Sequence, residues 1–270
     1  MFGAILGDII GSPYELPYLN IKTKDFPLFI NHSTFTDDSV MTLAVAKAIM
    51  DTENKEDYIE LKKNLISSMQ SLGRAYPDAG YGANFIYWLF DNNPKPYVSY
   101  GNGSAMRVSS VAWLFDNIDT VRKVAKLSAE VSHNHPEGIK GAEATACAIF
   151  LARKGCDKSV IRHYIEEHFE YSFSRTCDEI RPTYHFSASC METVPEAMTA
   201  FFESCSFEDC IRTAVSLGGD CDTLTAIAGS IAEAYYGVPE YFKAECLSRL
   251  PNDLKNILIK FQNYITQYKG

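Results

Sequence analysis

The sequence predicts an all-α protein that forms one domain over residues 1–270. Apolar residues recur at helical spacing almost throughout the chain, whereas the strict alternation of a half-buried strand is nearly absent. No internal repeat, low-complexity tract or Pro/Gly/Ser-rich linker marks a domain boundary. Since 46% of the 270 residues are hydrophobic, the chain is long enough to bury a full core without covalent cross-links.

The expected helices form two groups. Three stretches are apolar on most sides and are expected to be buried helices: residues 39–50, 137–154 and 222–236. Five others are amphipathic: residues 56–72, 119–131, 157–169, 206–217 and 253–268. Residues 16–35 and 170–190 lack helical periodicity and are rich in Pro, Phe and Tyr, so we expect them to be irregular covering loops.

Another helix is expected at the N-terminus, where Gly3, Gly7 and Gly11 are spaced four residues apart. Residues with this spacing share one face of a helix. Glycine inside a helix costs about 1 kcal/mol relative to alanine. Three glycines on one stripe therefore predict that another helix, or a ligand, approaches the backbone closely.

Composition excludes some classes of function. The chain has 25 Lys and Arg residues against 34 Asp and Glu residues, a net charge of −9, so we expect no general nucleic-acid binding, which needs a basic face. No run approaches the ~18 apolar residues of a membrane span, and Asp8 interrupts the N-terminal apolar stretch. The eight cysteines include no C-x-x-C pair and are expected to be small buried residues. A monomeric cytoplasmic protein is therefore expected.

Two acidic clusters each stand at the start of a predicted buried helix. They are Thr36, Asp37 and Asp38 before residues 39–50, and Asp220, Asp222 and Thr223 at the start of residues 222–236. Either cluster alone is compatible with a helix N-cap followed by acidic residues in the first turn. Together they supply four carboxylates and two hydroxyls, which suit Mg²⁺ or Mn²⁺ rather than zinc. If the two helix starts face each other, this ligand count fits two metal ions.

Further polar residues could complete a site. Ser99, Tyr100, Gly101, Asn102 and Gly103 form a glycine-containing loop before an apolar run. The amides of such a loop can hold a phosphate or diphosphate, or can simply make a tight turn. The loop is neither a Rossmann fingerprint nor a P-loop, because no strand precedes it and no Gly-Lys-Ser/Thr follows it. His133, at a corner between helices, and Glu15, after the first helix, are each compatible with a structural or a functional role.

Six motifs occur in a familiar order between residue 3 and about residue 237. They are GAILGDIIGSPYE, FTDDSVMTLAVAKAIM, GYGANFIYWL, SYGNGSAMRVSSVAWLF, SHNHPEGIKGAEATA and SLGGDCDTLTAIAGSIAEAYYG. This order closely resembles the ADP-ribosylglycohydrolase family, of the dinitrogenase-reductase-activating glycohydrolase type. Several separated motifs in a family's order are far more specific than any one of them.

The resemblance implies an all-α domain with a binuclear Mg²⁺ or Mn²⁺ centre in a cleft. It also implies an enzyme that hydrolyses the bond between C1″ of ADP-ribose and an acceptor, often an arginine or serine side chain, and so reverses mono-ADP-ribosylation. By motif position, one half of the metal site would be Thr36, Asp37 and Asp38, and the other half Asp220, Asp222 and Thr223.

The resemblance also assigns the remaining candidates. The loop of residues 99–103 matches the segment that holds the diphosphate and its neighbouring ribose, and His133 matches a ligand-contacting position. Glu15 matches a glutamate that guards the metal centre and assists proton transfer in serine-specific relatives, although the arginine-directed branch does not uniformly keep it. Tyr81, Gly82, Phe85 and Trp88 match a segment beside the cleft, where core packing explains the aromatic residues equally well.

The expected chemistry passes through an oxocarbenium-like state. On this hypothesis the metals bind the 2″ and 3″ hydroxyls and orient C1″ toward a water molecule. Asp37 and Asp220 would act as catalytic metal-ligating carboxylates, and Glu15 or one of the metal ligands would protonate the leaving group.

Other classes of function fit less well. An isoprenoid synthase needs Asp-Asp-x-x-Asp, but Met41 stands at the final position after Asp37 and Asp38. A metal-dependent HD-type phosphohydrolase needs a His-Asp dipeptide, which the chain lacks. A non-catalytic ADP-ribose-binding or structural member of the family, or a hydrolase of a non-protein conjugate, stays open as an alternative. Metal-dependent turnover distinguishes the enzyme from the binder.

Overall fold

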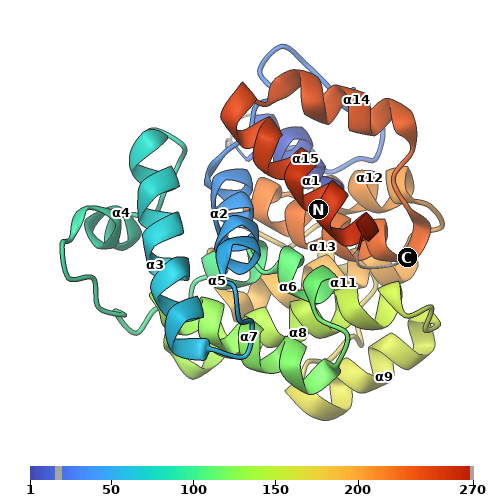
Figure 1. Cartoon of the computed structure of the whole chain (residues 1–270). Coiled ribbons are helices and arrows are strands. Elements are labelled where there is room, and N and C mark those ends of the chain that lie inside the picture. The colour runs from blue at the N-terminus through green and yellow to red at the C-terminus, as the bar shows by residue number, and fades with distance from the viewer. Residues whose placement is uncertain (16–19, 268–270) are drawn as a thin grey trace.

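The structure, a computed structural model, describes residues 1–15 and 20–267 (Figure 1). Over these ranges the chain forms fifteen α-helices and one 3₁₀ helix, and its extended segments make only an isolated bridge between Gly101 and Ser189. The predicted all-α fold class is therefore confirmed. The helices α3 and α4 project from one side of the molecule, while α13 runs through its middle (Figure 1).

The helices are numbered in the order in which they occur along the chain. Their bounds are α1 (Phe2–Gly11), η1 (Ser12–Tyr14), α2 (Asp37–Asp51), α3 (Tyr58–Ala75), α4 (Ala83–Phe90), α5 (Gly103–Met106), α6 (Ser109–Leu114), α7 (Ile118–Glu130), α8 (Pro136–Arg153), α9 (Lys158–Phe169), α10 (Cys177–Ile180), α11 (Cys190–Glu203), α12 (Phe207–Leu217), α13 (Cys221–Tyr236), α14 (Glu240–Arg249) and α15 (Asn252–Gln267).

Most of the expected helices are present. The three buried stretches are α2, α8 and α13, and the five amphipathic stretches are α3, α7, α9, α12 and α15, although residue 268 lies outside the described residues. The helices α4, α11 and α14 were not predicted. In α11 the interior residue Pro195 removes a backbone donor and usually breaks a helix, and α4 has only eight residues.

The two predicted covering loops are mostly irregular. In residues 16–35, the described part has no helix, while residues 16–19 lie outside the described residues. Residues 170–190 include one short helix, α10, that begins with a capping box between Thr176 and Glu179.

The centre of the fold is a contact between the backbones of α1 and α13. A Cβ atom on Gly7 would lie 2.2 Å from the carbonyl oxygen of Thr225, and one on Gly3 would lie 2.1 Å from that of Gly229. A Cβ on Gly229 would in turn lie 2.4 Å from the carbonyl oxygen of Gly3. The glycine stripe therefore accommodates another helix, which is one of the two expectations drawn from the sequence, and the backbones of α1 and α13 are in direct contact.

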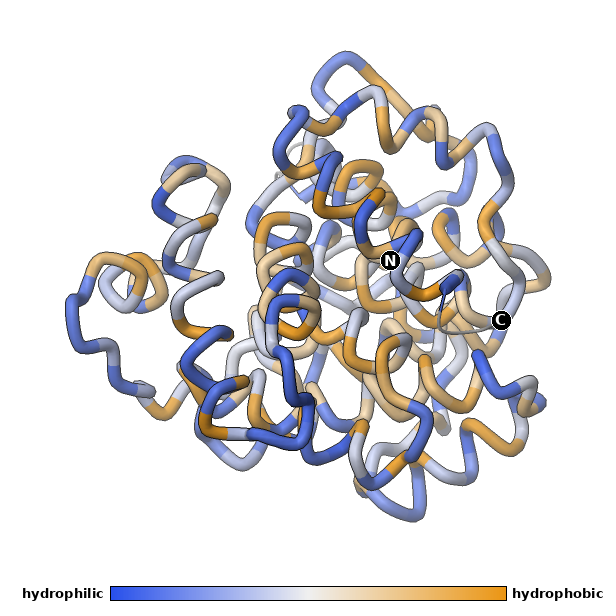
Figure 2. The backbone as a smooth tube through the Cα atoms, in the orientation of Figure 1, coloured by the Kyte–Doolittle hydropathy of each residue, from blue (hydrophilic) through white to orange (hydrophobic). Residues whose placement is uncertain are grey.

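Hydrophobic residues are concentrated in the central helices, and hydrophilic residues lie mainly on the outer helices and loops (Figure 2). Six of the eight cysteines are buried, and all eight are free thiols. No helix in the described ranges is both long enough and apolar enough to cross a membrane.

Candidate active site

A cleft of about 380 Å³ opens where the starts of α2 and α13 meet the loop before α5. Twelve of the thirteen candidate site residues line it: Glu15, Thr36, Asp37, Asp38, Ser99, Gly101, Asn102, Gly103, His133, Asp220, Asp222 and Thr223. Residues that lie up to 208 positions apart in sequence, such as Glu15 and Thr223, are thus brought to one cavity.

Tyr100 is the one candidate that does not line the cleft. Its side chain is 52% exposed and its ring lies edge-on to that of His135, with 5.6 Å between ring centres. Its backbone is held in place by α11, because its carbonyl oxygen accepts a hydrogen bond from Cys190 N (3.0 Å).

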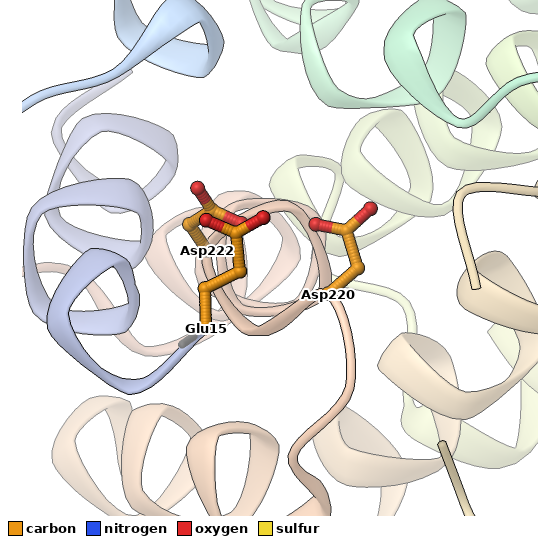
Figure 3. A group of neighbouring side chains, drawn as sticks. All are labelled: Glu15, Asp220 and Asp222. Atoms are coloured by element: carbon orange, nitrogen blue, oxygen red, sulfur yellow. The ribbon is translucent and has the colours of Figure 1, made fainter. Parts of the chain in front are cut away.

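One part of the cleft, which we call the carboxylate end, contains Glu15, Asp37, Asp38, Asp220 and Asp222. Glu15 follows η1, and α13 supplies Asp220 as its N-cap and Asp222 in its first turn. Figure 3 shows Glu15, Asp220 and Asp222 gathered at the start of α13, and one carboxylate oxygen of each lies within 4.8 Å of the others.

The two acidic clusters touch each other directly. Thr36 is the N-cap of α2 and lies 3.5 Å from Asp222 Oδ2 through its hydroxyl. Thr223, in the first turn of α13, donates a hydrogen bond to Asp38 Oδ2 (3.1 Å). The starts of α2 and α13 therefore form one continuous polar surface, because each presents side chains that the other binds.

Asp8 of α1, which the sequence analysis did not assign to the site, binds the start of α2 through hydrogen bonds. Its fully buried carboxylate accepts hydrogen bonds from Thr36 N (2.9 Å), Thr36 Oγ1 (2.7 Å), Ser39 N (3.0 Å) and the Ser39 hydroxyl. These bonds join α1 to the first turn of α2. The only sequence signal was an aspartate in the middle of an otherwise apolar helix.

Burial and mutual repulsion perturb the carboxylates. Burial, followed by the charge on Asp222, raises the pKa of Asp8 and of Glu15 to about 7. The same two causes hold the pKa of Asp37, Asp38 and Asp220 well above the usual range. The cluster is therefore electrostatically unfavourable when all of its members are ionised.

These residues fit a divalent cation. Within residues 1–15 and 20–267, Asp38 Oδ1 is buried and has no hydrogen-bond partner, although its other oxygen is bound by Thr223. An unpartnered buried carboxylate oxygen is costly unless something compensates it. The donor set consists of carboxylate and hydroxyl oxygens, which are the ligands of Mg²⁺ or Mn²⁺.

The loop of residues 99–103 positions one of these carboxylates. Asn102 Nδ2 donates to Asp220 Oδ2 (2.7 Å) and to Thr193 Oγ1 (3.0 Å). The amide of Gly101 donates to Ser99 Oγ (3.1 Å), and the amide of Asn102 donates to the carbonyl oxygen of Ala188 (2.8 Å). Two of the amides that could have held a phosphate are thus already bound within the protein.

Backbone geometry explains how this loop reaches the cleft. Val98, directly before the loop, has a φ of 57°, which is rare for a β-branched residue. Its amide is held by Asn134 Oδ1 (2.7 Å). A Cβ on Gly138, in the first turn of α8, would lie 2.7 Å from the carbonyl oxygen of Ser99, so the loop packs against a bare backbone.

Another part of the wall, which we call the histidine end, contains the buried side chains Arg107, Ser132 and His133. Arg107 and His133 line the cleft, and Ser132 lies between them. Burial, followed by the charge on Arg107, holds the pKa of His133 well below its usual range. Among the lining residues of the described chain, Arg107 is the sole lysine or arginine.

Several wall residues were not singled out as ligand-contacting candidates. Gly82 and Phe85 line the cleft, whereas Trp88 stacks on Phe85 from behind, with 5.3 Å between ring centres. Phe186 and Ala188 also line it and come from residues 170–190, the segment expected to cover the site. Phe186 is 62% exposed at the cleft, and no sequence periodicity distinguished it from its neighbours.

Comparisons with known proteins agree on one family. A family model described as ADP-ribosylglycohydrolase matches residues 1–267. ADP-ribosylhydrolase ARH3 of Homo sapiens is 28% identical, covering 90% of this chain and 87% of that protein. ADP-ribosylarginine hydrolase Tri1 of Pseudomonas putida is 25% identical, covering 88% and 70%. A solved structure titled ADP-ribosylglycohydrolase-related protein complex has a TM-score of 0.69 at 21% identity, covering 96% and 95% of the chains.

Proposed function

We propose, from the premise that this chain belongs to the ADP-ribosylglycohydrolase family, that it is a metal-dependent hydrolase that releases ADP-ribose from a modified protein side chain. The observation that carries the proposal is the meeting of two acidic helix starts in one cleft, where Asp38 Oδ1 has no hydrogen-bond partner in the part of the chain that the structure describes. A protein that only bound ADP-ribose would have no need for so many buried carboxylates, because their burial is costly.

Two Mg²⁺ or Mn²⁺ ions are the proposed cofactors. The residues that would hold them are Thr36, Asp37, Asp38, Asp220, Asp222 and Thr223. When bound, such cations supply Lewis-acid activation of water and attract the hydroxyls of a sugar. Because the carboxylates repel one another without a cation, we expect cation binding to lower their pKa values and to complete this end of the cleft.

The protein's own residues would then orient and protonate the substrate. Asn102 holds Asp220 in a fixed direction through a 2.7 Å hydrogen bond. Glu15 borders the cleft beside Asp220 and Asp222, and burial, the first cause of its raised pKa, also favours its protonated form when a cation is bound. We assign to Glu15 the protonation of the leaving group, a step that relieves the charge developing on the departing atom.

The acceptor is the finer part of the proposal. We expect a protein arginine or serine side chain, and the family resemblance supports either. The P. putida relative is named as an arginine-directed hydrolase, whereas the ARH3 relatives carry no acceptor in their names. The alternative is a non-protein conjugate of ADP-ribose, which would present the same half to the cleft. We further propose a monomeric cytoplasmic enzyme, with which the free thiols and the net charge of −9 are compatible.

The test measures free ADP-ribose released from two matched peptides, one carrying ADP-ribosyl-arginine and the other ADP-ribosyl-serine. Each peptide is incubated with Mg²⁺, with Mn²⁺ and with EDTA. Release from one peptide that EDTA abolishes and added cation restores would support the proposal and identify the acceptor. Release that is equal with EDTA, in protein shown to be free of metal, would contradict it. No release from either peptide, in protein that binds the cation, would favour the non-protein conjugate or the binder.

A further inference from the structure

The histidine end contains a buried chain of hydrogen bonds whose direction can be worked out. Arg107 is fully buried, and its Nη2 donates to the carbonyl oxygen of Ser128 (2.8 Å) and to Ser132 Oγ (2.9 Å). Ser132 Oγ lies 2.8 Å from His133 Nδ1. The chain therefore runs from a permanent cation, through one hydroxyl, to one nitrogen of an imidazole that borders the cleft.

Counting protons along this chain fixes the tautomer of His133. A guanidinium can only donate, so Ser132 Oγ accepts from Arg107. The buried Ser132 hydroxyl must then donate its own proton, and within the described chain His133 Nδ1 is the acceptor it reaches. If Nδ1 carried a proton, the hydroxyl proton would have no acceptor, at a cost of about 1–3 kcal/mol. The imidazole proton therefore belongs on Nε2.

The surroundings also keep the ring neutral. A charged imidazolium would lie buried beside Arg107. The other titratable group that faces the ring is Tyr97, at 5.6 Å between ring centres, and burial raises the pKa of Tyr97 to about 12, so it adds no negative charge. Phe85, at 6.1 Å between ring centres, is apolar. Nothing in direct contact with the ring thus favours its protonation.

The other ring nitrogen faces the glycine loop. His133 Nε2 would lie 3.4 Å from a Cβ on Gly101 and 3.2 Å from one on Gly103, so both glycines leave the ring edge uncovered. Over residues 1–15 and 20–267, the ring hydrogen bond of His133 is made by Nδ1, and Nε2 forms none with a protein atom. Since the amides of Gly101 and Asn102 are already bound, the Nε2 hydrogen is a donor that the protein leaves for a ligand.

The packing behind the chain holds it still. The Arg107 guanidinium lies over the ring of Phe85 at 5.7 Å, and Phe85 stacks on Trp88. Trp88 Nε1 donates to the carbonyl oxygen of Val131 (2.9 Å), directly before Ser132. The turn that carries Ser132 and His133 is therefore tied to the same aromatic stack that supports Arg107.

We propose that Arg107 and Ser132 are positioning residues that fix His133 as its neutral Nε2–H tautomer, which donates a hydrogen bond to an anionic oxygen of ADP-ribose. The identity of this ligand rests on the proposed function, whereas the tautomer does not. The arrangement gives the cleft a donor that neither rotates nor changes its protonation state, beside a loop in which the amides of Gly101 and Asn102 are already bound within the protein.

The first test is nitrogen NMR of the histidine rings in the intact protein without ligand, with the His133 signals assigned by their loss in His133→Gln. We expect one protonated nitrogen, Nε2, and one unprotonated nitrogen, Nδ1, for wild-type His133 at pH 7. In Ser132→Ala we expect signals averaged between the two tautomers. A wild-type ring with its proton on Nδ1, or on both nitrogens, would overturn the proposal.

The second test is a double-mutant cycle in which ADP-ribose affinity is measured by calorimetry with Mg²⁺ present. Ser132→Ala should weaken ADP-ribose binding about tenfold, because without the Ser132 hydroxyl the imidazole proton can move from Nε2 to Nδ1. His133→Gln places an amide donor near the Nε2 position, and this amide has no second tautomer. Adding Ser132→Ala to His133→Gln should therefore cause no further loss of ADP-ribose affinity. Ser230→Ala, which removes a buried hydroxyl from the far half of α13, should bind as wild type does.

The outcomes separate the two proposals. An equal loss on Ser132→Ala with histidine and with glutamine at position 133 would make Ser132 a structural residue and would overturn the inference. A wild-type protein that shows the Nε2–H signature but binds no ADP-ribose would overturn the ligand named here together with the proposed function. The NMR spectrum would then still support the inference that the imidazole proton of His133 is on Nε2.

Discussion

At the carboxylate end of the cleft, five acidic side chains crowd together, and one buried oxygen, Asp38 Oδ1, has no hydrogen-bond partner among the described residues. At the histidine end, the buried cation of Arg107 is bound by a carbonyl and a hydroxyl, and the bonds continue to His133. The first end has oxygen ligands that a cation would complete, whereas the second binds its own cation, Arg107, through protein groups and leaves the Nε2 hydrogen of His133 for a ligand. One cleft can therefore separate a reacting end, where crowded carboxylates repel one another, from a binding end whose side chains are held in place by hydrogen bonds.

The largest expected effect comes from breaking the carboxylate end. Asp220→Ala removes a carboxylate that Asn102 holds in place, so we expect ADP-ribose release to fall by about a thousandfold or more, while the fold is retained. Turnover is measured with Mg²⁺, and the fold is checked by circular dichroism. Asp25→Ala, at an exposed loop position, is the matched control and should keep full activity.

This prediction also sharpens the contrast between the two ends. Loss of Asp220 should reduce turnover far more than ADP-ribose affinity, whereas changes at the histidine end should do the reverse. If Asp220→Ala turned over substrate at a near-normal rate in metal-free protein, the metal-dependent mechanism would be wrong.

A smaller effect is expected from the glycine stripe that carries the carboxylate end. In Gly7→Ala the added methyl would lie 2.2 Å from the carbonyl oxygen of Thr225, so α1 and α13 must separate. We expect a loss of roughly 1–3 kcal/mol of unfolding free energy, because overpacking a rigid contact has that cost. Gly82→Ala is the control, since a Cβ there meets nothing within 4 Å. Equal urea midpoints for the two variants would contradict the backbone contact.

The smallest expected effect is a dependence of stability on pH. The pKa of Asp8 is about 7 in the folded protein against an ordinary value of 3.8 in the unfolded chain. The folded state therefore binds more protons than the unfolded state between about pH 4 and pH 7. The metal-free protein should therefore lose stability as pH rises through this window, with a fall of several degrees in Tm between pH 5 and pH 7.5 in EDTA. Mg²⁺ should reverse the loss at pH 7.5.

Asp38→Asn provides the control for this pH dependence. The amide oxygen can still accept from Thr223, and the amide nitrogen replaces the oxygen that has no partner. In EDTA this variant should melt higher than wild type at pH 7.5, and its Tm should change less with pH. A wild-type Tm that is constant or rises from pH 5 to pH 7.5 would contradict the electrostatic picture of the carboxylate end.

Sequence reasoning found those features whose signal is local. The acidic clusters were visible because each sits at the start of a buried helix, and α2, α8 and α13 were visible through their apolar periodicity. It did not find α11, because Pro195 in its interior removes a backbone donor that the surrounding packing makes dispensable. The all-α fold and twelve of the thirteen candidate residues that line the cleft could therefore be predicted, and the exception among the candidates is Tyr100, which does not line it.

The undetected parts depend on contacts between distant segments. Asp8 was visible only as a charge in an apolar helix, and its role depends on the approach of Thr36 and Ser39. Arg107 lies within a recognised motif, but the residues next to it in the sequence do not indicate that its side chain is fully buried. Phe186 reaches the cleft because its segment binds the glycine loop through Ala188. Such roles follow from the packing of the folded chain rather than from local spacing.

The backbone contact between α1 and α13 has a mechanical consequence. Helices that touch through glycine cannot move closer together, and matched glycines on both sides leave little freedom to slide. Asp220 and Asp222 therefore stand on a stiff support, while Asp37 and Asp38 belong to α2, whose start is held by hydrogen bonds to Asp8. Mg²⁺ binds oxygen at about 2.0–2.1 Å and Ca²⁺ at about 2.3–2.6 Å. Because the start of α2 is attached by hydrogen bonds rather than by a glycine backbone contact, we expect a difference in ionic radius to be accommodated there rather than at the start of α13.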